Sequence, residues 1–287
     1  MNIIITSDSS CDLSKEQLET LNIKILPLYV NLNGEEFRDG INISPQDIFN
    51  FVKENKKLPK TSALSMADYS LFFSTILNQN KDSEIIHIGL SSELSTSYNN
   101  SVNASKELDG KVTVIDGKNL STGTGLLVLY AAKLAKEGLQ KDEMIEKVSK
   151  RVPFVQASFI IPETEYLYRG GRCSAIAMLG ANLLKIKPRI QVIDGKMKPY
   201  GKPRGKMVPV LKQYIDDVLT EFNTPDPEIC FVTHSTIEPE VAEEIKQYVE
   251  SKNIFKEVVI TTAGATITSH CGKGTLGILY INDGGKV

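Results

Sequence analysis

The sequence has no excess of charge of either sign. Its 287 residues include 33 Lys and Arg against 35 Asp and Glu, which gives a formal net charge of -2. Proteins that bind nucleic acids or anionic membranes usually carry a basic excess or a basic stripe, because phosphate groups attract lysine and arginine. The composition therefore argues against nucleic acid as a partner of this chain.

Cysteine is scarce, and long apolar runs are missing. Cys11, Cys173, Cys230 and Cys271 form no CxxC pair, which is typical of free thiols in a reducing compartment rather than of a disulfide framework or a zinc site. The opening segment MNIIITSDSS lacks the basic flank and apolar run of a signal peptide, and no run approaches membrane-spanning length. We therefore expect a cytoplasmic protein without a transmembrane segment.

Familiar catalytic and nucleotide motifs are absent as well. There is no GxSxG elbow and no HExxH zinc signature, and VIDGKNLSTGTG lacks the GK[ST] ending of a phosphate loop. The two acids of SDSSCD, Asp8 and Asp12, are interpreted as part of a capped turn after the first strand. The sequence thus predicts no cofactor and no metal.

The chain does contain a regular alternation of strand-like and helix-like runs, long enough in total for two lobes. The expected strands cover residues 2–6, 24–32, 84–90, 111–116, 157–162, 228–234 and two further runs near the end of the chain. The expected helices include 44–55, which opens with Ser44 as N-cap and Pro45, 67–80, 93–107 and 124–138, and a helix followed by a hairpin is expected over 179–197. This alternation predicts two α/β lobes with mostly parallel sheets covered by helices, residues 1–155 and 156–287.

Polar side chains gather in loops near four predicted strand ends, where ligands of open α/β sheets bind. PKTSALS carries Thr61 and Ser62, SSELSTSY carries Ser92 and Ser95, YRGGRCS and KPRGK carry Arg172 and Arg204, and ATITSHCGKGTLG carries His270. One hydroxyl suffices to cap a helix, so the surplus serines suit an anion, as do guanidinium and imidazole N–H groups. Helix caps, surface ion pairs and a core histidine are the ordinary alternatives, and from the residues alone they stay open.

Seven of these segments occur in an order that resembles the DegV family of bacterial fatty-acid-binding proteins. They are DSSCDL, KTSALS, SSELSTSY, VIDGKNLSTGTG, LYRGGRCS, LGANLLKIKP and TSHCGKGTLG, and they span nearly the whole chain. The resemblance implies a two-lobed carrier that encloses one long-chain fatty acid, such as palmitate, in an apolar tunnel. It also implies that the carrier performs no chemistry and presents the carboxylate to a separate fatty-acid kinase, which makes acyl phosphate from ATP.

The resemblance assigns the head-group site residue by residue. It implies that Thr61, Ser62, Ser95 and His270 bind the fatty-acid carboxylate, and that Ser92, Arg172 and Arg204 are secondary head-group or partner contacts. The sequence departs from the family pattern in three places. TSALS stands for TSQPS, STSYNNS stands for SGTYQSA, and HCGKGTLG stands for HTGPGALG, which introduces Ala63, Thr96, Cys271 and Lys273.

Transfer energies indicate how much the tail and the head group of a fatty acid would each contribute to its affinity for such a site. About fifteen methylenes at about 0.8 kcal/mol each gain about 12 kcal/mol before the costs of association, whereas a charge-assisted hydrogen bond contributes about 1.5–3 kcal/mol. The tail would therefore dominate affinity, and the hydroxyls would make a buried carboxylate tolerable. Two other functions remain open: a serine-dependent acyl hydrolase or acyltransferase that uses Ser95 with His270, and a lipid-sensing regulatory protein.

Overall fold

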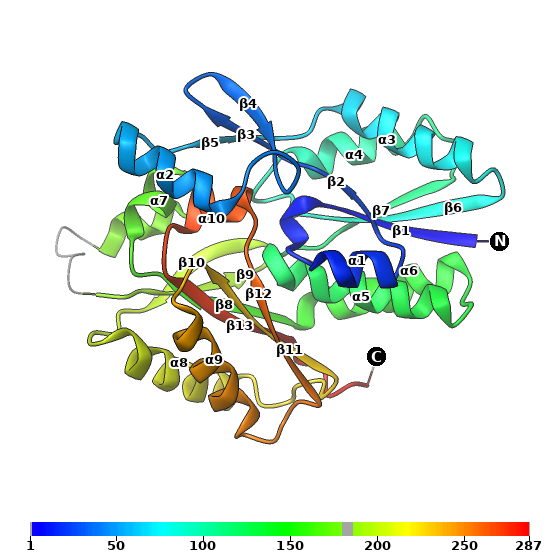
Figure 1. The fold of residues 1–287 in the computed structure, drawn as a ribbon. Coiled ribbons are helices and arrows are strands. Elements are labelled where there is room, and N and C mark those ends of the chain that lie inside the picture. Colours follow the sequence, from blue (N-terminus) through cyan, green and yellow to red (C-terminus); the bar gives the residue numbers. More distant parts are fainter. Residues whose placement is uncertain (1, 180–185, 287) are drawn as a thin grey trace.

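The first half of the chain builds a parallel sheet from the apolar runs of the sequence. In the computed structural model, which describes residues 2–179 and 186–286, the strand order is β2-β1-β6-β7 and every neighbouring pair is parallel. The strands are β1 (Asn2–Asp8), β2 (Lys24–Leu26), β6 (Ser83–Gly89) and β7 (Val112–Asp116). Helices α3 and α4 contact one face of this sheet, and α5 and α6 contact the other (Figure 1).

The helices begin where the sequence places good caps. The Ser44 side chain accepts a hydrogen bond from the backbone N–H of Asp47, and the Asp47 carboxylate accepts one from the backbone N–H of Ser44. The predicted start of the helix at Pro45 is therefore confirmed. Ser65 and Asp68 repeat this arrangement one helix later. The α-helices are α1 (Lys15–Thr20), α2 (Pro45–Asn55), α3 (Met66–Gln79), α4 (Ser97–Ser105), α5 (Ser121–Lys136), α6 (Lys141–Arg151), α7 (Thr164–Arg169), α8 (Met207–Glu221), α9 (Pro239–Glu250) and α10 (Ala265–Cys271).

The second half of the chain builds a six-stranded sheet with the order β10-β9-β8-β13-β11-β12. Its strands are β8 (Val155–Ile160), β9 (Arg189–Ile193), β10 (Lys196–Gly201), β11 (Ile229–Ser235), β12 (Glu257–Thr262) and β13 (Thr275–Ile281). Only β11 and β12 pair in parallel, and the other neighbours are antiparallel. The α/β class is confirmed, whereas the prediction of a mostly parallel sheet is wrong for this half.

The burial of the central strands explains that error. Every residue of β8 and of β13 is buried, because α8 and α9 cover one face of the sheet and α5 packs on the other. A strand buried on both faces reads as a continuous apolar run, which is the pattern usually produced by parallel sheets. The direction of β13 cannot be deduced from that run.

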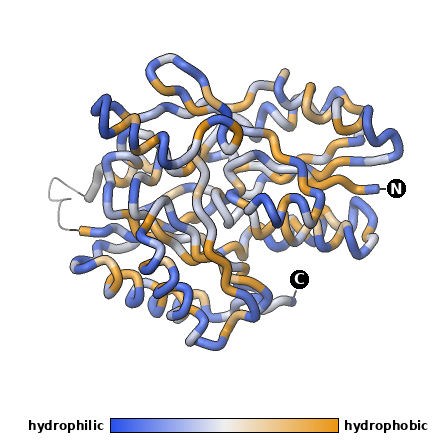
Figure 2. Tube along the Cα trace, in the orientation of Figure 1, coloured by the Kyte–Doolittle hydropathy of each residue, from blue (hydrophilic) through white to orange (hydrophobic). Residues whose placement is uncertain are grey.

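Helix α5 is the layer that joins the two halves. It contacts β1 and β6 of the first sheet as well as β8 and β13 of the second, and most of its residues from Ser121 to Leu134 are buried. One hydrophobic core therefore runs from Ile86 through Leu127 to Phe159 and Leu279. Figure 2 shows the apolar segments gathered along the strands, with hydrophilic segments on the outer helices.

The boundary between the lobes stays a prediction at residues 155 and 156. It is supported by the sheets, because the first ends at Asp116 and the second begins at Val155.

A small antiparallel sheet, β4-β3-β5, lies beside α10 (Figure 1). Its strands are β3 (Tyr29–Leu32), β4 (Glu35–Arg38) and β5 (Lys60–Ser62). The expected single strand over 24–32 is therefore wrong: it divides at Pro27 into two strands of different sheets. The expected loop at Thr61 contains β5, and α10 was not predicted. The hairpin of β9 and β10 is confirmed, and residues 180–185 of the helix expected before it lie outside the described residues.

Candidate ligand-binding site between the lobes

A cavity brings together five of the seven residues that the sequence nominated. Its wall includes Thr61, Ser62, Ser95, Arg172 and His270, and its remaining lining is mainly apolar. The cavity offers about 50 Å³ to the centres of water molecules, within about 520 Å³ of space that atoms do not occupy. A few polar side chains thus share the lining of a small, mainly apolar cavity, which is the usual character of a ligand site.

Thr61 and Ser62 reach the cavity from β5. Antiparallel pairing with β3 sets Thr61 opposite Val30 and Ser62 opposite Tyr29. Successive residues of a strand point to opposite sides. The side chains of the half-buried Thr61 and the exposed Ser62 therefore do not face the cavity in the same direction.

Ser95 stands in the turn before α4 and has a local role as well. Its hydroxyl accepts from the backbone N–H of Ser97 at 3.2 Å and lies 3.0 Å from the Ser97 hydroxyl. Ser97 itself accepts from the backbone N–H of Leu64 at 3.2 Å, so it ties the start of α4 to the segment that follows β5. The serine-rich stretch therefore combines helix-start hydrogen bonds with one hydroxyl, that of Ser95, at the cavity wall.

His270 is presented by α10, which two buried carboxylates from the first half of the chain hold in place. Asp39 accepts from the backbone N–H groups of Ala265 at 2.7 Å and Thr266 at 3.2 Å. Asp12 accepts from that of Gly264 at 2.8 Å. These are the free N–H groups of the helix start, so Asp39 caps α10 from a distant segment. Sequence reasoning missed Asp39 and confined Asp12 to a local turn.

The imidazole of His270 is neutral at pH 7. Burial, together with the charge of Arg172, lowers its pKa from 6.5 to about 4. Its Nε2 lies 2.8 Å from Oγ1 of Thr61, whereas its buried Nδ1 has no partner among the described residues. A buried N–H without an acceptor costs more than an unused lone pair, so we place the proton on Nε2, where it is donated to Thr61. The Thr61 hydroxyl is then free to donate into the cavity.

The double glycine of YRGGR has a different explanation at each position. A Cβ on Gly170 would clash with Nδ1 of His270 and stand 2.8 Å from the Tyr166 carbonyl oxygen, so this glycine makes room for the imidazole. Gly171 has a φ of +70° with open space around it, so its requirement is conformational. The exposed Arg172 follows, and its guanidinium donates to the carbonyl oxygens of Gly170 at 2.8 Å and Leu94 at 3.4 Å.

A second, more apolar cavity continues from the first. The two share Leu120, Ile267 and Cys271, and the second offers about 30 Å³ to water centres. Its further lining includes Ala157, Phe159, Val192, Ala263 and Leu279, which all come from the second half of the chain. The second cavity thus adjoins the first on the side of the shared core of the two lobes.

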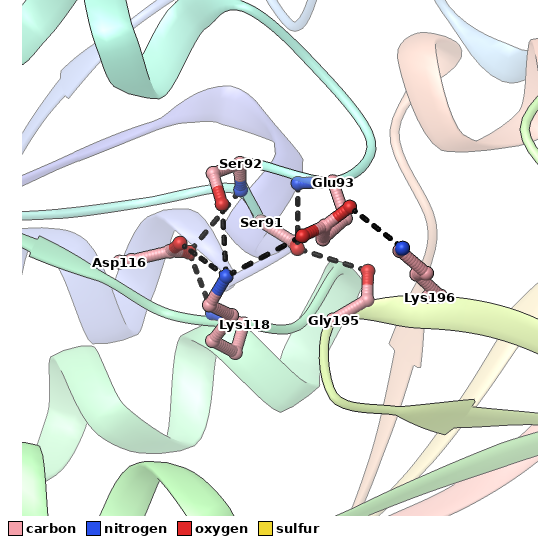
Figure 3. A network of polar contacts seen from close by, with 7 residues as sticks. All are labelled: Ser91, Ser92, Glu93, Asp116, Lys118, Gly195 and Lys196. Carbon is pink, nitrogen blue, oxygen red and sulfur yellow. Dashed lines mark hydrogen bonds and ion pairs between the residues drawn. The ribbon is translucent and has the colours of Figure 1, made fainter.

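Two nominated residues lie elsewhere. Ser92 is not in the lining of this cavity: its hydroxyl accepts from Nζ of Lys118 at 3.0 Å and its N–H donates to Asp116 at 3.2 Å, within the polar network of Figure 3. Arg204 is exposed in the segment between β10 and α8, likewise outside the lining. The geometry does not bring either residue to the proposed head group.

Two of the four departures from the family pattern line the cavity. Ala63 and Cys271 line it, with Cys271 also part of the second cavity. Thr96 is exposed at the start of α4, and its side chain makes no capping hydrogen bond. Lys273 is exposed. Burial raises the pKa of the Glu163 carboxyl, and the positive charge of Lys273 opposes that rise.

Within residues 2–179 and 186–286 no group of His, Cys, Asp and Glu is arranged to hold a metal ion. In the same part of the chain, no helix combines the length and the apolar character needed to cross a bilayer. The four cysteines are buried free thiols.

Comparisons with known proteins agree over nearly the full length. The family model described as "Uncharacterised protein, DegV family" matches residues 2–283. A DegV domain-containing protein of Staphylococcus aureus (strain COL) is 33% identical over 281 residues, which cover 97% of this chain and 98% of that protein. A structure described as fatty acid binding of a DegV family protein from Thermus thermophilus has a TM-score of 0.91 at 27% identity, covering 98% of this chain and 100% of that one. A stearic acid-binding protein from Eubacterium ventriosum has a TM-score of 0.86 at 26% identity, with 100% of both chains covered.

Proposed function

We propose that this chain, which belongs to the DegV family, is a cytoplasmic carrier that binds one long-chain fatty acid and presents its carboxylate to a fatty-acid kinase. The acyl tail, for example that of palmitate, lies in the second cavity, and the carboxylate lies in the first. The solved relatives from Thermus thermophilus and Eubacterium ventriosum, described as binding fatty acids, support this assignment.

The observation that carries the proposal is that the two cavities adjoin. The first is lined by Thr61, Ser62 and Ser95, and the second, more apolar cavity shares Leu120 and Ile267 with it. This order of polar and apolar surface matches the order of groups along a fatty acid. Burial of the tail then supplies most of the affinity, and the polar end sets its direction.

The carboxylate is held by neutral donors in this proposal. The Thr61 hydroxyl, oriented by His270, donates to one carboxylate oxygen. The Ser95 hydroxyl, which donates to Ser97 in the structure, turns to donate to the other, and each such bond offsets part of the cost of burying the charge. Arg172 adds a positive charge on the exposed side of the same cavity. The carboxylate therefore stays near the surface, where a kinase can transfer the phosphoryl group of ATP to it, and the carrier contributes no reacting group.

The serine hydrolase alternative finds little support in the geometry. A catalytic serine needs a histidine as base and an acid that orients the histidine. Here Nε2 of His270 is bonded to Thr61, Ser95 is bonded to Ser97, and Nδ1 of His270 has no acid partner among the described residues. No observation favours the lipid-sensing alternative over the carrier.

Mass spectrometry of the denatured protein tests the proposal. Protein purified from a bacterial host should release about one long-chain fatty acid per chain, and the delipidated protein should rebind palmitate or oleate. A chain that is empty and that binds neither acid would contradict the proposal. Hydrolysis of activated acyl esters that disappears in Ser95→Ala would instead favour the enzyme.

A further inference from the structure

A third cavity adjoins the far end of the apolar one. The two share Ala157 and Val192, and the third offers about 440 Å³ to water centres, far more than either of the others. Side chains from β8, β9 and the end of α8 line it, together with the loops that follow β6 and β7. The cavities therefore adjoin one another in the order first, second, third.

This cavity lies where two neighbouring strands, β8 and β9, stop pairing. Pairing between β8 and β9 runs from Ile160 with Arg189 to Ser158 with Gln191 and goes no further. The remainder of β8, from Val155 to Ala157, stays paired with β13, while the end of β9 follows its hairpin partner β10. The gap between the diverging ends of the two strands is called the wedge. It is lined by residues of the lobe interface and by a residue at the end of α8.

Two buried amides in the wedge lack donors. Gln156 is 3% exposed and Gln191 is 7% exposed, both line the cavity, and Oε1 of each has no hydrogen-bond partner among the described residues. The Nε2 of Gln156 is occupied, because it donates to Oγ of Ser158 at 2.7 Å. A buried acceptor without a donor is costly, so the pair indicates a ligand group that donates hydrogen bonds.

Charges at the rim disfavour an anionic ligand group. Glu93 and Asp194 line the cavity, and the ammonium of Lys118 is already paired with Asp116 at 3.1 Å and Glu93 at 3.9 Å. Figure 3 shows this network, in which Ser91 also donates to the Gly195 carbonyl oxygen at 2.9 Å across the lobes. A second carboxylate would meet like charges here, whereas a neutral hydroxyl would not.

We propose that the third cavity receives the far end of the acyl chain and selects long-chain fatty acids that carry a hydroxyl at that end. The inference rests on the proposed function, since the carboxylate occupies the first cavity and the tail occupies the second. The terminal hydroxyl passes between β8 and β9 beside Ala157 and Val192. It then donates to the amide oxygen of Gln191 or Gln156, whose side chain turns toward the cavity to receive it. A terminal methyl group cannot satisfy either oxygen.

Paired acids test the inference. The dissociation constants of tetradecanoic, hexadecanoic and octadecanoic acids are compared with those of their terminally hydroxylated forms on the delipidated full chain. If the third cavity offered only apolar surface to the end of the chain, the hydroxylated acids would bind about tenfold or more weakly than their parents, because an unpaired hydroxyl would be buried. We expect at least one hydroxylated acid to bind at least as tightly as its parent.

Variants assign the effect to the wedge. Gln191→Leu should weaken that hydroxylated acid about tenfold and change the binding of its parent less than about twofold, whereas Gln213→Leu on the exposed side of α8 should change neither. If Gln191→Leu does not fold, Gln156→Leu replaces it with the same expectation. The inference is wrong if every hydroxylated acid binds the wild type more weakly than its parent, or if the glutamine variants affect both acids equally. Failure of all six acids to bind would overturn the proposed function itself.

Discussion

Gly170 and His270 act as one unit at the first cavity. The imidazole occupies the space that a Cβ on residue 170 would need, and it orients Thr61 through Nε2. Gly170→Ala should therefore push His270 away from Thr61 and weaken fatty-acid binding about tenfold, the value of one good hydrogen bond. Isothermal titration with palmitate measures the loss.

Gly171→Ala is the matched control for that substitution. Its φ of +70° makes alanine strained there, but no atom of the described residues lies within 4 Å of the added Cβ. This variant should lose stability of about 1 kcal/mol and keep its affinity. Equal affinity losses in the two glycine variants would show that backbone strain, not contact with His270, controls binding.

Head and tail should contribute unequally to affinity. Ser95→Ala or His270→Ala removes one polar contact and should weaken palmitate binding about 10- to 100-fold. Ala263→Phe fills the second cavity, which excludes several methylenes, so its loss should exceed that of either head-group variant. Titration of the three variants, each checked for an unchanged fold by circular dichroism, would contradict this if the losses were equal.

The histidines should make stability fall as the pH drops. Burial lowers the pKa of His87 to about 3, and burial with the charge of Arg172 lowers that of His270 to about 4. The unfolded chain keeps the ordinary value near 6.5, so between pH 6.5 and 4 it binds more protons than the folded chain. Stability is thus full above pH 6.5 and is lost towards pH 4.

Urea unfolding at pH 7.5 and pH 5.0 checks this prediction. The loss between the two pH values should be smaller in His270→Asn than in the wild type by roughly 1–2 kcal/mol, because the variant lacks one of the groups that take up protons on unfolding. Other titrating groups are the same in both proteins and cancel. An identical pH dependence would mean that His270 titrates normally in the folded state.

Individual site residues were only partly predictable. Thr61, Ser62, Ser95, Arg172 and His270 share one cavity as the motif order implied, although the role of each stays a proposal. Ser92 shares its stretch with Ser95 but turns into the network around Lys118, and nothing in SSELSTSY distinguishes the two hydroxyls. That distinction depends on the turn before α4, which local sequence does not specify.

At the scale of elements, α10 depends on a cap that lies far away in the sequence. Its residues, ATITSHC, are mostly β-branched or hydroxylic and have low helix propensity, which is why no helix was predicted there. Asp39 satisfies two N–H groups of its first turn and also accepts from the Ser9 hydroxyl at 3.0 Å. Tertiary hydrogen bonds thus replace local propensity.

Asp39→Asn should weaken the hydrogen bonds that hold the start of α10 in place. The amide retains one acceptor where the carboxylate has two, so stability should fall by about 1–2 kcal/mol and palmitate affinity should fall with it, because His270 moves. Urea unfolding and titration measure the two effects. Asp217→Asn, at an exposed carboxylate on α8, is the control, and matching behaviour of the two variants would refute the anchoring role.

At the scale of the whole molecule, the lobes should unfold together. Helix α5 contributes to both sheets, and one core runs through the interface. Calorimetry should therefore show a single transition with equal calorimetric and van't Hoff enthalpies, shifted upward by excess palmitate. Two resolved transitions, with only one of them moved by palmitate, would show that the lobes are independent.

The overall fold was more predictable than its details. Alternating runs identify an α/β chain with helices over sheets, since burial of one face of each element imposes that alternation. Strand direction in the second sheet and the split of 24–32 at Pro27 were missed, because pairing partners are set by contacts between distant segments. Cavities depend on the same distant contacts.

A crystal structure of the chain with bound hexadecanoic acid tests the central claim most directly. We predict continuous density for the acid, with its carboxylate within hydrogen-bond distance of the Thr61 and Ser95 hydroxyls and its tail passing Leu120 and Ile267 into the second cavity. Density for the acid on the outer surface, with side chains filling both cavities, would contradict it.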